Sequence, residues 1–318
     1  MCAVAANPPE SHPSRILIVR LGAMGDVIHT LPAVGALATT FPSAEIVWAV
    51  DPKWAVLLEG NPHVHRVVRF NRHDWTSVRQ AFQQLRAMQF DFAVDFQGLI
   101  KSALLATAAR PERIYGFTRG EARETPATWC YSSLASTSAP HIVDKNLELA
   151  ALAGARRRGV EFPLPEGGPE GELPQGPFVL ANPLAGWVSK QWPLAYYSQL
   201  AEMLEVPLVL NGAPSSEAEL RQVKGARIHL SGIRGLIHAT RRATAVVGVD
   251  SGPLHLAAAL GKPGVAIFGP TDPARNGPYG GTIKVLRDPN VETSYKRGKE
   301  IGAAMRSIKP ALVRDYLS

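Results

Sequence analysis

Short apolar runs rich in β-branched residues alternate with helix-period stretches along the first half of the chain. A helical pattern is clearest over residues 75–88, where apolar side chains recur every three to four positions. Such alternation predicts a parallel sheet with right-handed helical crossovers. Pro32 lies inside the helical pattern after the first strand and should shorten or kink that helix. The predicted strands are RILIVR (15–20), EIVWAV (45–50), HRVVRF (65–70), FDFAVDF (90–96) and ERIYGF (112–117).

The same rhythm restarts after residues 163–177, a segment rich in proline and glycine that predicts a linker. The strands that follow are PFVLAN (177–182), VPLVLNG (206–212), ARIHLS (226–231), ATAVVGVD (243–250) and GVAIFG (264–269). We predict an α/β protein of two doubly wound, Rossmann-like domains, residues 15–162 and 178–318, after a flexible arm over residues 1–14. The last helix is a candidate to pack back on the first domain. Two such domains that face each other place a cleft at the carboxyl ends of both sheets.

Composition narrows the class of protein. The chain has 318 residues, 46% of them apolar, and only two cysteines, which is too few for a disulfide framework. It has no signal-peptide pattern and no apolar stretch long enough to cross a membrane, so we expect a cytoplasmic location. The net charge of +7 is spread over both halves, which argues against a nucleic-acid domain. It concentrates at 156–158, around Arg119 and Arg123, and at 294–317, and these clusters suit an anionic lipid or the inner-membrane surface.

The turn after the first strand, "RLGAMGDVIHTLP" (20–32), resembles a phosphate-binding loop that carries a carboxylate. Gly22 and Gly25 follow the strand and a helical pattern comes next, which is how many anion-binding turns begin. Asp26 occupies the place where a phosphate would lie. The simplest structural role for Asp26 is to stabilise the first turn of the helix.

A second turn of this type ends the strand at 243–250. Asp250, Ser251 and Gly252 precede a helical stretch that contains His255, and the backbone N–H groups of Ser251 and Gly252 can face an anion. Helix capping alone explains one serine or aspartate here, but not the whole cluster. Lys190, between Trp187 and Trp192, is either a surface lysine or a cation for a diphosphate.

Taken together, the motifs LGAMGDVIHTLPAV, DFQGLIKSALLA, KQWP, NGAP and VDSGPLHLAAALGKP…FGPTDP resemble bacterial family 9 glycosyltransferases, above all the type I lipopolysaccharide heptosyltransferases. The resemblance covers almost the whole chain with the motifs in order. It implies a GT-B fold, which agrees with the two predicted domains. It also implies an inverting, metal-independent transfer of L-glycero-D-manno-heptose from ADP-heptose to the Kdo residue of Kdo2-lipid A, with no cofactor.

The resemblance implies a role for several residues. Asp26 matches the general base that takes the proton of the acceptor hydroxyl, and Lys190 matches a lysine that contacts the donor diphosphate. Asp250, Ser251, Gly252 and His255 match the donor site. Two positions in the predicted donor site depart from the family pattern. Ala185 and Gly186 replace a threonine pair, and either Ser216 or Glu217 aligns with the glutamate that holds the ribose. On the acceptor side, the matching or neighbouring basic residues are Arg72, Lys101, Arg119 and Arg123.

Other functions remain open at this level. One alternative is heptosyltransferase II or another family 9 enzyme with a different sugar nucleotide, and another is a GT-B-like sugar-nucleotide epimerase, which needs no acceptor. A protein that binds a sugar nucleotide without turning it over is also compatible with these motifs. A dinucleotide oxidoreductase is disfavoured because the first turn reads G-x-x-G-D rather than G-x-G-x-x-G. His63, His65 and His238 have none of the companions that a zinc site requires, so we expect no metal.

Overall fold

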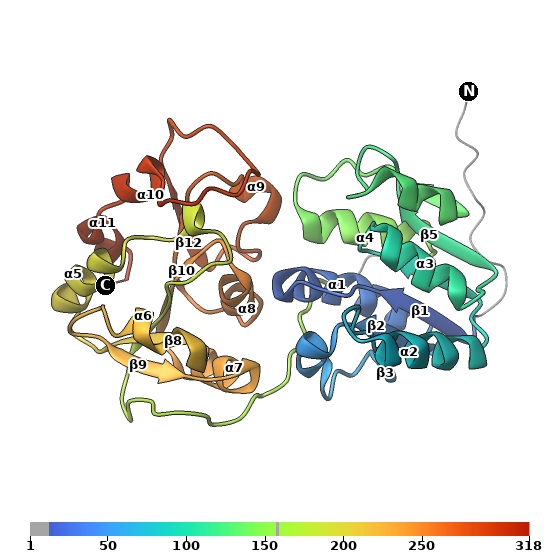
Figure 1. Ribbon diagram of the computed structural model, residues 1–318, viewed down its shortest axis with the longest axis horizontal. Helices are drawn as coiled ribbons and strands as arrows, with labels where there is room; N and C mark the ends of the chain where they lie inside the picture. The colour runs from blue at the N-terminus through green and yellow to red at the C-terminus, as the bar shows by residue number, and fades with distance from the viewer. Residues whose placement is uncertain (1–12, 157–158, 318) are drawn as a thin grey trace. The chain divides into compact units, whose positions relative to one another are not determined.

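The computed structural model describes residues 13–156 and 159–317 and divides the chain into two compact units between Pro165 and Glu166 (Figure 1). Most of the predicted arm, as well as two of the three arginines at 156–158, lies outside the described residues. No helix in the described part of the chain is long and apolar enough to cross a membrane.

The first unit contains a six-stranded parallel sheet in the order β3-β2-β1-β4-β5-β6. Its strands are β1 (Arg15–Val19), β2 (Glu45–Val50), β3 (Arg66–Arg69), β4 (Phe92–Asp95), β5 (Arg113–Phe117) and β6 (Ser133–Ala135). All five predicted strands are present, with ends within two residues of the predicted ones. The edge strand β6 was not predicted, because three residues with only one buried side chain leave no apolar run to detect.

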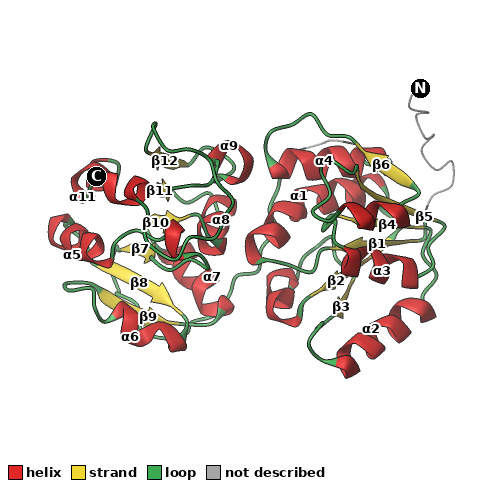
Figure 2. Ribbon diagram, turned by 45° about the horizontal axis from the view of Figure 1, so that its top comes forward, coloured by secondary structure: helices red, strands yellow, loops and turns green. Residues whose placement is uncertain are grey.

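Helices cover both faces of this first sheet (Figures 1 and 2). Helix α1 packs against α4 on one face, and α2 lies beside α3 on the other. On the second face, apolar side chains of α2 and α3 join those of the strands in a continuous buried core. The helical elements are α1 (Met24–Thr40), α2 (Trp75–Ala87), α3 (Ile100–Ala108) and α4 (Ile142–Leu152), with the short 3-10 helices η1 (Pro52–Leu58) and η2 (Thr125–Cys130).

Of the two predicted effects of Pro32, a shorter helix or a kinked one, the first is wrong, because α1 continues through Pro32 to Thr40. A proline inside a helix removes one hydrogen bond and crowds the preceding turn, at a cost of about 3 kcal/mol. Most residues of α1 between Met24 and Leu37 are buried, and the helix packs along α4. This packing offsets the cost, since tertiary contacts supply most of the stability of a protein helix.

The second unit repeats the same topology in its own sheet, which has the order β12-β11-β10-β7-β8-β9 and is parallel throughout. Its strands are β7 (Val179–Asn182), β8 (Leu208–Gly212), β9 (Arg227–Leu230), β10 (Ala245–Val249), β11 (Gly264–Phe268) and β12 (Ile283–Arg287). The predicted strands are again present within two residues, and the half-buried edge strand β12 was missed. Two doubly wound α/β units of this kind are the predicted fold class.

Two buried apolar clusters lie on the two faces of the second sheet. One includes side chains of α5, α10 and α11, with α11 packed on α5, and the other includes side chains of α7 and α8. The helical elements are α5 (Leu194–Met203), α6 (Glu217–Leu220), α7 (Ile233–Arg242), α8 (Gly252–Ala259), α9 (Pro273–Asn276), α10 (Ala303–Ser307), α11 (Pro310–Asp315), η3 (Val188–Lys190) and η4 (Pro214–Ser216).

Each sheet has one pair of adjacent strands whose connections leave in opposite directions, β1 with β4 and β7 with β10. Loops diverge beyond the carboxyl ends of such a pair, which is where doubly wound sheets bind ligands. Val19 lies opposite Asp95 in the first sheet, so the residues after β1 and β4 reach the same edge together. Both turns singled out from the sequence therefore follow a central strand, β1 or β10.

Candidate functional site

Asp26 lies in the first turn of α1, immediately beyond the end of β1. Its Oδ2 accepts the backbone N–H of Ala23 at 3.1 Å, which closes the first turn of the helix. Gly22 is required by a close approach, because a Cβ at this position would lie 2.6 Å from the indole Nε1 of Trp54. Gly25 is the second residue of the helix and is buried.

Two arginines hold the Asp26 carboxylate. Arg20 Nη2 lies 2.8 Å from Oδ1, and Arg123 Nη2 lies 2.8 Å from Oδ2. The side chain of Arg20 is almost wholly buried, that of Asp26 is one fifth exposed, and that of Arg123 is 45% exposed. Burial alone would raise the pKa of Asp26, but Arg20 and Arg123 outweigh it and hold the pKa well below its ordinary value. Asp26 is therefore ionised at neutral pH. One of its two cations, Arg20, is buried, and the other, Arg123, is accessible to a ligand.

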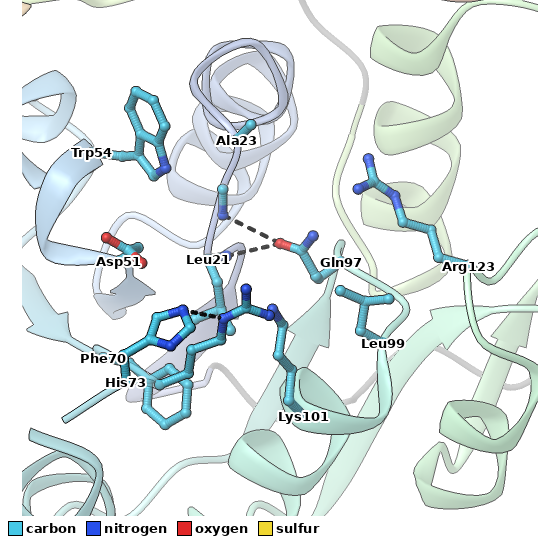
Figure 3. Close-up of a pocket in the computed structure, with 12 residues that line it drawn as sticks. Leu21, Ala23, Asp51, Trp54, Phe70, His73, Gln97, Leu99, Lys101 and Arg123 are labelled. Carbon is cyan, nitrogen blue, oxygen red and sulfur yellow. Dashed lines mark hydrogen bonds between the residues drawn. The ribbon is translucent and has the colours of Figure 1, made fainter. Parts of the chain in front are cut away.

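The loop after β4 fixes the turn that carries Asp26. The Gln97 side-chain oxygen accepts the N–H groups of Leu21 at 3.0 Å and Gly22 at 3.3 Å, as Figure 3 shows. Asp95 in turn accepts the backbone N–H of Gln97 at 2.8 Å and the hydroxyl of Tyr131 at 2.6 Å. Burial raises the pKa of Asp95, although its hydrogen bonds oppose that shift. These contacts link the ends of the two central strands.

A basic pocket opens at this edge of the first sheet (Figure 3). Asp51 and Trp54 lie on one side of it, and Gln97, Lys101 and Arg123 lie on the other. Burial, together with the nearby Arg72, lowers the pKa of Lys101. Crowded cations of this kind attract anions, because an anion relieves their mutual repulsion. The lining residues are Leu21, Gly22, Ala23, Asp51, Trp54, Phe70, Arg72, His73, Gln97, Leu99, Lys101 and Arg123.

The structure brings together three of the four basic residues assigned to the acceptor side. Arg72, Lys101 and Arg123 line the pocket, whereas Arg119 is exposed in the same loop as Arg123 without lining it. Sequence reasoning missed Arg20, Gln97 and Trp54. Arg20 left a signal that could have been used, since it is a charged residue directly after a strand that is buried at all but its first residue. Gln97 lies in the quoted motif DFQGLIKSALLA, which could have singled it out, whereas Trp54 left no signal, because its role comes from its approach to Gly22, far away in the sequence.

The second half holds a different arrangement around Asp250, which follows β10. Asp250 Oδ2 lies 2.5 Å from Lys190 Nζ and accepts the hydroxyl of Thr271 at 2.6 Å. His255 Nε2 lies 3.7 Å from the other oxygen, Oδ1. Burial would raise the pKa of Asp250, but His255 and Lys190 hold it well below its ordinary value. Thr271 belongs to the FGPTDP segment, so the structure joins the motif KQWP and both parts of the motif VDSGPLHLAAALGKP…FGPTDP in one cluster.

The amino terminus of α8 adjoins this cluster. Ser251 is the N-cap residue and Gly252 is the first residue of the helix. The hydroxyl oxygen of Ser251 is buried and has no hydrogen-bond partner among the described residues. Buried hydroxyls are ordinarily paired, so an unpaired one beside the N–H of Gly252 at the start of α8 indicates a place for an external acceptor oxygen.

Two cations lie on one aromatic ring beside the cluster. Lys190 Nζ is 4.3 Å from the centre of the Trp187 ring, and the Arg297 guanidinium carbon is 5.8 Å from it. Lys190 is already paired with Asp250, whereas Arg297 is exposed and has no ion-pair partner in the described chain. Trp187 therefore holds one compensated and one uncompensated positive charge next to α8.

The remaining donor-side candidates occupy loops of the second unit. The Ala185 carbonyl accepts a hydrogen bond from the Gln191 side chain at 3.1 Å, and Gly186 is exposed with open space where a Cβ would lie. Ser216 ends η4, and Glu217 begins α6, where its carboxylate pairs with Arg221 at 2.5 Å. No contact in the described residues joins these two to the Asp250 cluster. Over the same residues, no group of three metal-ligating side chains is placed to hold a metal ion.

Comparison with known proteins gives a consistent result. The model of glycosyltransferase family 9 (heptosyltransferase) matches residues 78–303. The lipopolysaccharide heptosyltransferase 1 of Pseudomonas aeruginosa is 32% identical over 298 residues, which cover 84% of this chain and 81% of that protein.

Solved structures agree. Escherichia coli heptosyltransferase WaaC with ADP aligns with a TM-score of 0.79 and 25% identity, over 95% of this chain and 98% of that one. The same enzyme with ADP-2-deoxy-2-fluoro heptose gives a TM-score of 0.76 at 25% identity over the same shares of the two chains.

Proposed function

The chain belongs to glycosyltransferase family 9, and we propose that it transfers heptose from ADP-heptose to the Kdo residue of Kdo2-lipid A, with inversion at the anomeric carbon and without a metal ion. The observation that carries this proposal is the basic pocket beside Asp26, in a chain whose relatives include a lipopolysaccharide heptosyltransferase 1 and an enzyme solved with ADP. An ionised carboxylate and a set of cations at one sheet edge suit an anionic acceptor that must lose a proton.

The pocket supplies the acceptor side of the proposed reaction. Kdo carries a carboxylate, and the lipid to which it is attached carries phosphates. Arg72, Lys101 and Arg123 offer the charge-assisted hydrogen bonds that such groups require, and arginine can bind a carboxylate through two parallel N–H donors. Gln97, whose oxygen is occupied by the β1 turn, has its amide nitrogen left to donate to a sugar hydroxyl.

Asp26 is the general base in this proposal. Its carboxylate accepts the proton of the acceptor hydroxyl as that oxygen attacks the anomeric carbon, a role commonly worth on the order of 10²–10⁴ in rate. Two arginines make a carboxylate a weak base, so the resting arrangement does not suit the reaction. An acceptor carboxylate that takes over Arg123 would leave Asp26 with Arg20 alone and make it a stronger base as the substrate binds.

The Asp250 cluster supplies the donor side. Lys190 and the start of α8 suit the diphosphate, whose leaving portion gains negative charge as the glycosidic bond breaks. Asp250 orients Lys190 rather than reacting, since its Oδ2 binds Lys190 and Thr271 and its Oδ1 faces His255. The unpaired hydroxyl of Ser251 is placed to donate to a phosphate oxygen. A lysine and helix N–H groups thereby take the part that a metal ion plays in other transferases.

A lipid acceptor implies work at a membrane surface. We therefore place the enzyme on the cytoplasmic side of the inner membrane, associated with it peripherally.

The test is to profile donors and acceptors with the purified enzyme. ADP release should require both ADP-heptose and Kdo2-lipid A, and other sugar nucleotides should be poor donors. Faster transfer to an acceptor that already bears one heptose would identify a heptosyltransferase II instead. Conversion of the sugar nucleotide without any acceptor would identify an epimerase, and donor binding with no turnover on any acceptor would identify a binding protein.

A further inference from the structure

One face of the first unit exposes large apolar side chains. Trp75 is 80% exposed, Trp129 is 75% exposed, and Leu104 and Ile100 are 52% and 43% exposed. They come from α2, α3 and η2, where α3 contacts both of the others, and both ribbon views show α2 beside α3 (Figures 1 and 2). We call this surface the α2–α3–η2 face. Exposed apolar groups that gather on neighbouring elements, unlike scattered single ones, mark a place of interaction.

Within the three elements of this face, every charged side chain is basic. Residues 75–87, 100–108 and 125–130 contain Arg79, Arg86 and Lys101 but no aspartate or glutamate. Neither Arg79 nor Arg86 has an ion-pair or hydrogen-bond partner among the residues that the structure describes. The acids that directly precede α2 and η2 in the sequence bind backbone N–H groups, since Asp74 accepts the N–H of Thr76 and Glu124 accepts the N–H of Ile100.

The side chains of α2 are arranged as in a helix that lies on a bilayer. Trp75, Val78 and Phe82 follow one another at helical spacing along a shallow groove, and Arg79 and Arg86 line the same groove. Indole rings prefer the boundary between acyl chains and water, and arginine stems can lie on apolar surface while the guanidinium reaches a phosphate. Ile100 and Leu104 add a second apolar row, because positions four residues apart share one side of α3.

The face is continuous with the basic pocket. Arg72 and His73 line the pocket and lead directly into α2 at Trp75, and Lys101 lines it from the position after Ile100. A lipid whose polar head entered the pocket would therefore have its bilayer beside α2 and α3.

We propose that the α2–α3–η2 face docks on an anionic lipid bilayer and presents the basic pocket to head groups at its surface. This inference rests on the proposed function in so far as the acceptor is a lipid. Charge complementarity selects the occupant, since Arg79 and Arg86, which have no acid paired with them among the described residues, suit anionic head groups. A two-fold dimer through the same face would set Arg79 and Arg86 of one copy against those of the other.

The carboxy-terminal cations, which the sequence analysis offered for the membrane, are a weaker candidate. Lys309 Nζ donates to the Tyr196 hydroxyl at 2.8 Å and to the Arg306 carbonyl at 3.0 Å, and Arg314 pairs with Asp315 at 2.7 Å. Lys309 and Arg314 are therefore engaged within the protein, and the other cations of this cluster lack the exposed tryptophans of the α2–α3–η2 face.

The experiment measures sedimentation of the full-length enzyme with phosphatidylcholine vesicles, with and without phosphatidylglycerol. The wild type should sediment only with phosphatidylglycerol present, and Trp75→Ala/Trp129→Ala should lower the partition coefficient at least about tenfold. Arg79→Gln/Arg86→Gln should lower it less, and the difference should vanish in high salt. The control is Met203→Ala/Tyr316→Ala, two exposed apolar side chains on the second unit, which should sediment as the wild type does. Thermal unfolding checks that each variant is folded.

Turnover separates this proposal from the proposed function. The Trp75/Trp129 variant should turn over a deacylated, soluble Kdo acceptor at the wild-type rate while losing activity on acceptor embedded in vesicles. A wild type that does not sediment, or a variant that sediments equally well, would overturn the docking proposal without touching the transferase assignment. So would a wild-type dimer in lipid-free sedimentation velocity that the variant abolishes, because that result would assign the face to a second copy.

Discussion

Asp26 and Asp250 both follow a central strand of a parallel sheet, both have a lowered pKa, and both are held by cations. Their partners differ in exposure. Asp26 shares its charge between a buried Arg20 and a half-exposed Arg123, whereas Asp250 lies among Lys190, Thr271 and His255, each at least 85% buried. A ligand can therefore reach the cation on one oxygen of Asp26, whereas the partners of both Asp250 oxygens are largely enclosed.

This difference shows why a similar position in two similar folds does not give a similar role. A carboxylate whose partner can be displaced is able to change its basicity when substrate arrives. A carboxylate enclosed by its partners instead fixes where they lie, so Asp250 sets the position of Lys190. Reactivity follows from the accessibility of the partners rather than from the carboxylate itself.

Substitution of Asp26 should have the largest effect on turnover. Asp26→Asn should lower kcat by about 10² or more, because the amide cannot accept the proton, and should leave ADP-heptose affinity within a few-fold of the wild type. Rapid-quench turnover and donor titration by calorimetry measure the two effects. Transfer at close to the wild-type rate would make Asp26 a structural residue and remove the distinction between the two carboxylates.

Substitution of Lys190 should have the next largest effect. It should change the kinetics with respect to the donor and leave the acceptor KM unchanged. Lys190→Ala should weaken ADP-heptose binding and also lower kcat, together roughly 10- to 100-fold in kcat/KM, because the charge on the leaving diphosphate grows in the transition state. Lys190→Arg is the matched control and should recover part of the loss. An unchanged kcat/KM for ADP-heptose would mean that the Asp250 cluster only stabilises the fold.

Arg123 tests whether the exposed partner of Asp26 belongs to the acceptor. Arg123→Ala should raise the acceptor KM about tenfold through the loss of one charge-assisted contact and leave donor affinity unchanged. Arg119→Ala is the control, since Arg119 lies in the same loop but outside the pocket. Weaker ADP-heptose binding with an unchanged acceptor KM would show that the two halves have been assigned in reverse.

The sequence allowed the two sheets and both turns to be predicted for a physical reason. Central strands of a parallel sheet are covered on both faces, so β1 and β10 read as apolar runs, and the turns follow directly from their ends. The edge strands β6 and β12 are half exposed and gave no such run. Periodicity does not reveal which strands are neighbours.

The strand order therefore explains what was missed in the site. Gln97 supports the turn before Asp26 only because β4 lies next to β1. The pairing of Arg123 with Asp26 likewise depends on where the loop after β5 lies. The quoted motifs supplied the candidate residues Asp26, Lys190 and Asp250, and the sheet topology was needed to see which side chains hold them.

Substitution of Arg297 should have the smallest effect. It tests whether the second half, like the first, has an exposed cation that a substrate can bind. Lys190 is largely buried and paired with Asp250, whereas Arg297 lies over the same Trp187 ring, is exposed and has no acid paired with it in the part of the chain that the structure describes. Arg297→Ala should raise the KM for ADP-heptose about three- to fivefold with kcat unchanged, as expected for an exposed contact worth below 1 kcal/mol. Lys299→Ala, two residues further along the same basic segment, is the control and should have no effect. If both variants instead leave the donor KM unchanged but weaken sedimentation with anionic vesicles, Arg297 belongs to a membrane-facing surface and Arg123 has no counterpart in the second half.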